Sequence, residues 1–126
     1  MKKTLLLLCL IILITSFVYC KKEFTIIGKW KAIESIGSNG ATKIHSKIEN
    51  GDEIIFEEDN IVIDHRQNKG KYEMLGDSLH IVFPNEEFFY FCRSNKWNSE
   101  EISLTPLTKE YQLICDEGCS TIYKKL

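Results

Sequence analysis

The sequence lacks the motifs that most often identify an enzyme. It contains no nucleophile motif, no glycine-rich loop that would cradle a phosphate and no zinc-protease signature. Its three histidines, His45, His65 and His80, lie in separate segments, so no close histidine pair could ligate a metal or supply a partnered general base. We therefore expect no catalytic residue, no metal and no cofactor.

A strong charge of either sign is also absent. The chain has 16 Lys and Arg against 18 Asp and Glu, and loss of Lys2 and Lys3 with a cleaved leader would leave 14 against 18. Nucleic acids select proteins with a concentrated basic face, so we expect no nucleic-acid partner. Neighbouring carboxylates fall at predicted turns, where solvated charge is usual. These are Glu57 to Asp59, Glu86 with Glu87, and Glu100 with Glu101.

The N-terminus has the pattern of an export signal. Two lysines precede an unbroken apolar run from Leu5 to Ile14, and no charge occurs between Thr4 and Cys20. The apolar stretch of about 15 residues is shorter than the roughly 20 that a membrane-spanning helix needs, and it fits a signal-peptide core. We predict a signal peptide over residues 1–19 and an exported protein. The alternative is an uncleaved anchor helix.

The end of this signal resembles a bacterial lipobox. In Phe17-Val18-Tyr19-Cys20 a cysteine closes the apolar segment, and the Lys21-Lys22-Glu23 continuation is similar to the start of many lipoproteins of Bacteroidetes-type bacteria. The resemblance implies lipid attachment, including palmitate, at Cys20, a tether over residues 20–27 and a location at the outer membrane of the cell envelope. The alternative is ordinary secretory cleavage after Cys20, which would give a soluble secreted protein.

The chain from Gly28 onward alternates short apolar patterns with turn residues. This spacing indicates an all-β sandwich or barrel, and closing an antiparallel meander removes its exposed edges. We predict a small up-and-down antiparallel β-barrel of eight or nine strands over residues 28–126. The predicted strands are 28–35, 53–57, 61–65, 70–75, 78–83, 87–93, 101–106, 111–115 and 119–125. We expect one or two helical turns between Thr42 and Glu49.

A period of two predicts the inward face of each strand. The expected inward residues are Ile54, Phe56, Ile61, Ile63, Tyr72, Met74, Leu79, Ile81, Phe83, Ile102, Leu104, Tyr111 and Leu113. The strand Phe88–Cys92 is apolar on both faces, with Phe88, Tyr90 and Cys92 on one and Phe89 and Phe91 on the other. The second face either lies under a neighbouring loop, beside Trp97, or forms an exposed patch that meets a partner or a membrane.

Gly28-Lys29-Trp30 at the start of the first strand resembles the Gly-x-Trp motif of lipocalins. Later segments are similar to small bacterial lipocalin-like domains: Glu53–Phe56, Gly70–Tyr72, Gly76–Leu79, Ile102–Leu104 and Ile122–Lys124. The resemblance implies that Gly28 and Trp30 form the closed base of the barrel, with Lys124 or Lys125 packed over the tryptophan.

Two functions follow from this resemblance. The first is a membrane-tethered binding protein for a small apolar ligand, and Tyr72, Phe88 and Tyr90 are the expected ligand-binding residues. The long connection from Gly37 to Gly51 would cover the barrel end opposite Trp30. The alternative is an envelope interaction or structural protein with a filled barrel, which binds another envelope protein and no small molecule.

Three cysteines remain beyond Cys20. Cys115 and Cys119 flank Asp116-Glu117-Gly118, which is typical of a three-residue hairpin loop, so the two cysteines would face each other near the separation that a disulfide prefers. We predict a Cys115–Cys119 disulfide and a buried free thiol at Cys92. The alternative pairs Cys92 with one of the other two.

Overall fold

The computed structural model describes residues 1–4, 23–95, 98–115 and 118–126. Nine strands form one antiparallel sheet in the order β2-β1-β3-β4-β5-β6-β7-β8-β9, and β1 also pairs with β9. The elements are β1 (Gly28–Ser38), β2 (Lys43–Lys47), β3 (Glu53–Glu57), the 3-10 turn η1 (Glu58–Asn60), β4 (Ile61–Ile63), β5 (Lys69–Leu75), β6 (Ser78–Val82), β7 (Glu87–Ser94), β8 (Glu101–Leu107) and β9 (Ser120–Lys125). The predicted closed up-and-down barrel is therefore confirmed, as eight strands with β2 as an addition.

Strand β1 exchanges one partner for another halfway along its length. Its first part pairs with β3, ending at Lys31 opposite Glu53, and its second part pairs with β2, beginning at Glu34 opposite Lys47. The change occurs at Ala32, whose N–H donates to the Asp52 carbonyl oxygen at 3.0 Å. The pairing with β9 is irregular at the same place, between Ala32 and Glu34. A bulge in β1 therefore lets one strand close the barrel and carry the extra hairpin.

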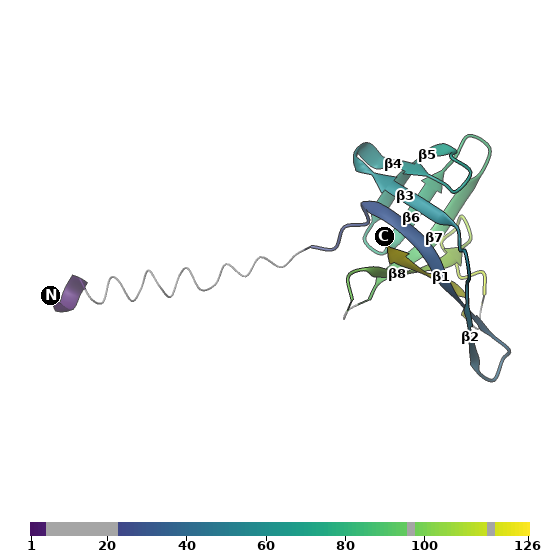
Figure 1. Ribbon diagram of the computed structural model, residues 1–126, viewed down its shortest axis with the longest axis horizontal. Coiled ribbons are helices and arrows are strands. Elements are labelled where there is room, and N and C mark those ends of the chain that lie inside the picture. The colour runs from purple at the N-terminus through teal and green to yellow at the C-terminus, as the bar shows by residue number, and fades with distance from the viewer. Residues whose placement is uncertain (5–22, 96–97, 116–117) are drawn as a thin grey trace.

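The segment after β1 corrects two predictions. In place of helical turns and a lid, the chain forms a β1–β2 hairpin that extends away from the rest of the barrel (Figure 1). All five residues of β2 are exposed, and Ile44 keeps 47% of its surface accessible. The turn depends on Asn39, whose Oδ1 accepts hydrogen bonds from the N–H groups of Ala41 and Thr42 at 3.0 and 2.9 Å. An Asn-Gly turn of this kind favours a hairpin over a helix.

The predicted strand at residues 111–115 is also wrong. The chain turns at this point, where the Tyr111 N–H donates to the Thr108 carbonyl oxygen at 2.9 Å and Tyr111 has a φ of 61°. Tyr111 and Leu113 are 46% and 54% exposed and do not face the core. The Thr108 N–H donates in turn to the Gln112 carbonyl oxygen, so local turn bonds replace a strand ladder.

The core fills the barrel between its walls. The most deeply buried side chains are Trp30, Phe56, Val62, Leu79, Ile81 and Ile102. In β4 the inward residue is Val62, paired with Phe56, and not Ile61 and Ile63 as predicted. Every residue of that three-residue strand is apolar, so alternation could not identify the inward face. No helix in the described part of the chain is long and apolar enough to span a membrane.

The base of the barrel is built around Trp30. Its side chain is fully buried, and its indole N–H donates to the Ile26 carbonyl oxygen at 2.7 Å. The Lys125 ammonium lies 5.3 Å from the ring centre, as the lipocalin resemblance implies for one of the two terminal lysines. Gly28 makes room for the Lys125 side chain, because a Cβ at Gly28 would lie 2.6 Å from Lys125 Cε. Ile26 belongs to the core, so the folded barrel begins two residues before Gly28.

Candidate functional site

A pocket of about 240 Å³ lies at the barrel end opposite Trp30. At the Trp30 end, Gly28 pairs with Phe56, which lies one residue before the end of β3, near η1. The pocket takes the other end of β3, together with the connections β4–β5 and β6–β7. It is therefore the open end of the barrel, and we refer to it as the open-end pocket.

The inner wall of the open-end pocket is aromatic and aliphatic. The apolar lining residues are Ile54, Ile81, Phe83, Phe88, Tyr90 and Tyr123. The rings of Phe88 and Tyr90 are nearly parallel with centres 6.2 Å apart, and Phe83 meets Phe88 edge-on at 6.3 Å. The wall therefore offers ring faces and edges to any occupant.

Two of the three residues predicted to bind a ligand meet in this pocket. Phe88 and Tyr90 line it, whereas Tyr72 lies outside it and packs edge-on against Phe56 at 4.9 Å. The Tyr72 hydroxyl donates to the Glu57 carbonyl oxygen at 3.0 Å, which directs that ring toward the base. Sequence reasoning missed Tyr123, although the alternation that places Lys125 inward places Tyr123 inward as well.

Close packing fixes the position of Phe83 in the wall. Gly70 lies beneath this side chain, and a Cβ at Gly70 would come within 2.4 Å of the Val82 carbonyl oxygen and 2.7 Å of the Phe83 ring. Only a residue without a side chain allows β5 and the end of β6 to approach this closely. The glycine therefore lets Phe83 fold over β5 and line the pocket.

Six polar residues form the rim of the pocket: Asp52, Glu53, Asp64, His65, Arg66 and Glu86. Two of the four carboxylates have strong protein partners. The Glu53 Oε2 lies 2.6 Å from the Lys29 Nζ, and the Asp64 carboxylate accepts hydrogen bonds from Arg66 N and from Asn68 N and Nδ2 at 2.8–2.9 Å. Burial acts to raise the pKa of Asp64, but these hydrogen bonds outweigh it and the pKa is lowered.

The other two rim carboxylates influence the tyrosines inside the pocket. Burial raises the pKa of Tyr90, and the negative charge of Glu86 adds to the effect. Burial also raises the pKa of Tyr123 to about 12, with further contributions from Tyr90 and from Asp52. Both phenols are therefore neutral at physiological pH. Within the described residues neither hydroxyl makes a protein hydrogen bond.

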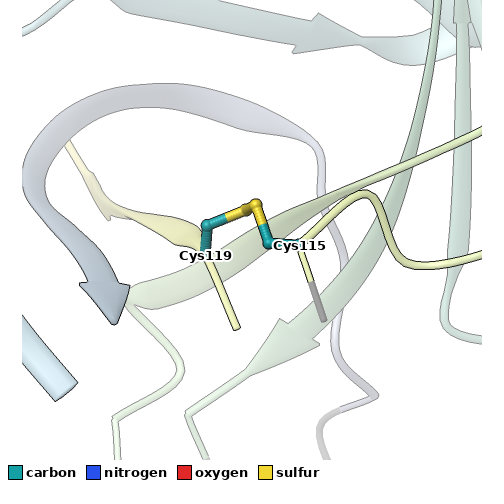
Figure 2. The surroundings of a disulfide bond; sticks show 2 residues. All are labelled: Cys115 and Cys119. Atoms are coloured by element: carbon teal, nitrogen blue, oxygen red, sulfur yellow. A yellow bond between two sulfur atoms is a disulfide. The ribbon is translucent and has the colours of Figure 1, made fainter. Parts of the chain in front are cut away.

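The cysteines occupy two different environments. Cys115 and Cys119 form a disulfide with a Cα–Cα distance of 5.7 Å, and Figure 2 shows their side chains pointing toward each other. Cys115 lies in the connection after β8 and not on a strand, so the bond ties this connection to the start of β9. Cys92 is a buried free thiol whose pKa is raised to about 12 by burial and then by the charge of Asp77. Cys20 lies outside the described residues, as do Asp116 and Glu117.

An apolar surface covers the outside of β7 and the connection after β8. We define the outer apolar patch as Phe89, Phe91, Tyr111, Leu113 and Ile114. The His80 ring stacks on Phe89 at 4.3 Å, Tyr111 meets Phe89 edge-on at 5.2 Å, and the Arg93 guanidinium lies over Phe91 at 4.7 Å. Phe89 is thus partly covered by a neighbouring loop, which agrees with one of the two interpretations of this strand. Trp97 lies outside the described residues.

No three His, Cys, Asp or Glu side chains in the described ranges lie close enough together to hold a metal ion. In comparisons with known proteins, no family model and no curated protein matches this chain. The small closed antiparallel barrel of eight strands is consistent with a calycin or lipocalin-like fold.

Proposed function

We propose that this protein binds a small, largely apolar ligand in the open-end pocket. The observation that carries the proposal is the aromatic wall of that pocket. Phe88, Tyr90 and Tyr123 keep part of their surface accessible at the end of an otherwise filled barrel. Ligand sites are commonly concave and mostly apolar with a few polar groups that fix orientation, and the rim supplies such groups.

The size of the pocket limits the size of the ligand. Its volume of about 240 Å³ lies below the range of roughly 300–1,000 Å³ that is usual for drug-sized ligands. A dry apolar cavity of about 150 Å³ already holds benzene. The proposed ligand is therefore a molecule with one ring or a short aliphatic body.

We further propose that the barrel is held at a bacterial envelope membrane by lipid on Cys20. Ile26, which belongs to the core at the Trp30 end, is the sixth residue after Cys20. An extended chain of this length reaches about 20 Å. The base of the barrel would then face the membrane, and the open-end pocket would face away from it. Such a protein would act by binding and not by catalysis.

A second function is favoured by the outer apolar patch. Tyr111, Leu113 and Ile114 are 46%, 54% and 59% exposed on one connection, and contiguous exposed apolar surface often marks a protein interface. In this alternative the barrel is an interaction protein of the envelope. Native gels of the source envelope would then show the protein in a complex. The double change Leu113→Ser and Ile114→Ser would remove that complex, whereas Ile54→Phe, which fills the pocket, would leave it intact.

Native mass spectrometry of protein purified from its source tests the first function. We expect a co-purified small molecule, and we expect Ile54→Phe to remove it because the larger side chain fills the pocket. Ile55→Phe is the matched control. Ile55 shares the outward face of β3 with the exposed Glu57, and it does not line the pocket. Retention of the molecule by the folded Ile54→Phe variant would contradict binding at this site.

A further inference from the structure

The charges at the mouth of the open-end pocket limit the chemistry of its ligand. On the basis of the proposed function, we infer that the ligand is a small organic amine, with its cationic head at Asp52 and Glu86 and its apolar body against Phe88, Tyr90 and Tyr123. Four carboxylates stand on this rim against one guanidinium and one imidazole. A concave site with an excess of one sign concentrates a field of that sign.

Asp52 and Glu86 are the rim carboxylates with the most capacity to bind a ligand. Glu53 is paired with Lys29, and Asp64 is occupied by its hydrogen bonds within the β4–β5 connection. In the described structure Glu86 has no ion pair within 4 Å, and the contact of Asp52 is with His65 Nδ1 at 3.6 Å. An ammonium group would form charge-assisted hydrogen bonds with either carboxylate.

Hydrogen bonds hold the main chain in place at both of these residues. The main chain at Asp52 is fixed by the hydrogen bond from Ala32 N to its carbonyl oxygen, at the point where β1 changes partners. Glu86 is fixed in the same way, because its carbonyl oxygen accepts the Phe83 N–H at 2.8 Å across the β6–β7 connection. Asp52 and Glu86 thus come from two different connections around one mouth.

The inner wall complements a cation as well. The neutral Tyr90 and Tyr123 hydroxyls have lone pairs that could accept hydrogen bonds from an ammonium, and both feel the negative charge of the rim. Ring faces attract cations because the electron density above an aromatic ring is negative. The same rings provide apolar area for the body of the ligand.

Arg66 is the principal opposing charge. It is exposed, it lies in the β4–β5 connection, and in the described structure it forms no ion pair within 4 Å. A carboxylate ligand would use this guanidinium. The single exposed guanidinium is outnumbered by the rim carboxylates, so the net charge favours a cation.

Three probes with the same ring and different heads test this inference by calorimetry: 2-phenylethylamine, 2-phenylethanol and 3-phenylpropionate. We expect the amine to bind at least about tenfold more tightly than the alcohol, as one charge-assisted hydrogen bond would supply, and the carboxylate to bind most weakly. Raising the ionic strength should weaken binding of the amine and leave the alcohol unchanged, because salt screens exposed charge.

The double change Asp52→Asn and Glu86→Gln should reduce amine affinity to that of the alcohol. The control is Glu73→Gln with Glu110→Gln, which makes the same change in net charge at exposed sites outside the pocket and should leave amine affinity unchanged. Equal or tighter binding of the alcohol or the carboxylate, abolished by Ile54→Phe, would overturn the amine inference and leave small-ligand binding standing. Failure of all three probes to bind would count against both.

Discussion

The Nζ atom of Lys125 lies 5.3 Å from the centre of the Trp30 ring, so the last residues of β9 close the base of the barrel over the buried tryptophan of β1. Trp30 and Lys125 are also cross-strand partners. The barrel is therefore sealed at this end by contacts between its first and last strands.

Loss of this contact should weaken the fold measurably. We expect Trp30→Ala to cost roughly 3–5 kcal/mol of the free energy of unfolding, in line with deletion of large aromatic side chains from cores. Lys125→Met keeps the aliphatic packing and removes the charge, and should cost about 0.5–1 kcal/mol. Urea unfolding measures both. Lys124→Met is the control, because Lys124 is exposed on the outer face, and an equal loss there would contradict a specific role for Lys125.

Gly70 should tolerate no side chain. Gly70→Ala would force a methyl group against the Val82 carbonyl oxygen and the Phe83 ring, so we expect a loss of roughly 1–3 kcal/mol, as for other overpacked sites. Because Phe83 lines the open-end pocket, the same change should alter ligand affinity. Gly37→Ala is the control, since a Cβ there would meet nothing within 4 Å. Equal stabilities of the two variants in urea would show that the close approach at Gly70 is unimportant.

Ionisation of the buried Cys92 thiol should lower the free energy of unfolding at alkaline pH. Its pKa is raised from 9.0 to about 12 by burial and by the charge of Asp77. The folded state thus keeps a proton that the unfolded state loses, so stability is retained below pH 9 and falls as the pH rises from 9 toward 12. The slope attributable to Cys92 should approach about 1.4 kcal/mol per pH unit.

The Cys92→Ala variant separates this effect from that of Tyr123, whose pKa is raised from 10.0 to about 12. Between pH 9 and 10 the variant should lose less stability than the parent, as measured by urea unfolding at each pH. Above pH 10 both should decline because of the tyrosine. A parent and variant with the same pH dependence would contradict the raised pKa of the thiol.

Membrane attachment should depend on Cys20. We expect Cys20→Ser to release the protein from the membrane fraction of its source cells, because the serine hydroxyl cannot take the place of the lipidated thiol. Cys92→Ala serves as the matched cysteine control and should remain with the membranes. Identical partitioning of Cys20→Ser and the parent would show that the protein is secreted without an anchor or held by an uncleaved helix.

The strands that the sequence predicts correctly are those with one apolar face. Leu79 and Ile81 alternate with polar residues, and that pattern placed β6 and its inward face correctly. Strand β2 lies outside the barrel wall with no apolar face, so the Asn39-Gly40 turn was its only sequence indication. Tyr111 and Leu113 gave the opposite error: their apolar alternation predicted a strand facing the core, but both side chains lie on the outer surface.

The pocket was only partly predictable for a related reason. Phe88 and Tyr90 stand in an unusually aromatic strand that the sequence identifies directly. Tyr72 and Tyr123 both face inward, and alternation does not say toward which end of the barrel a ring points. That direction depends on strand tilt and on bonds such as Tyr72 to Glu57, which appear only once the barrel is closed.

The pairing of β1 with β9 has a consequence for folding kinetics. The cross-strand pair of Trp30 and Lys125 joins residues from nearly opposite ends of the barrel sequence. Proteins whose contacts are this distant in sequence fold slowly, since loop-closure entropy is lost before the contacts can compensate for it. The barrel therefore cannot seal before β9 is available, and until then the edges of β1 and β8 stay open to any chaperone that binds extended chain.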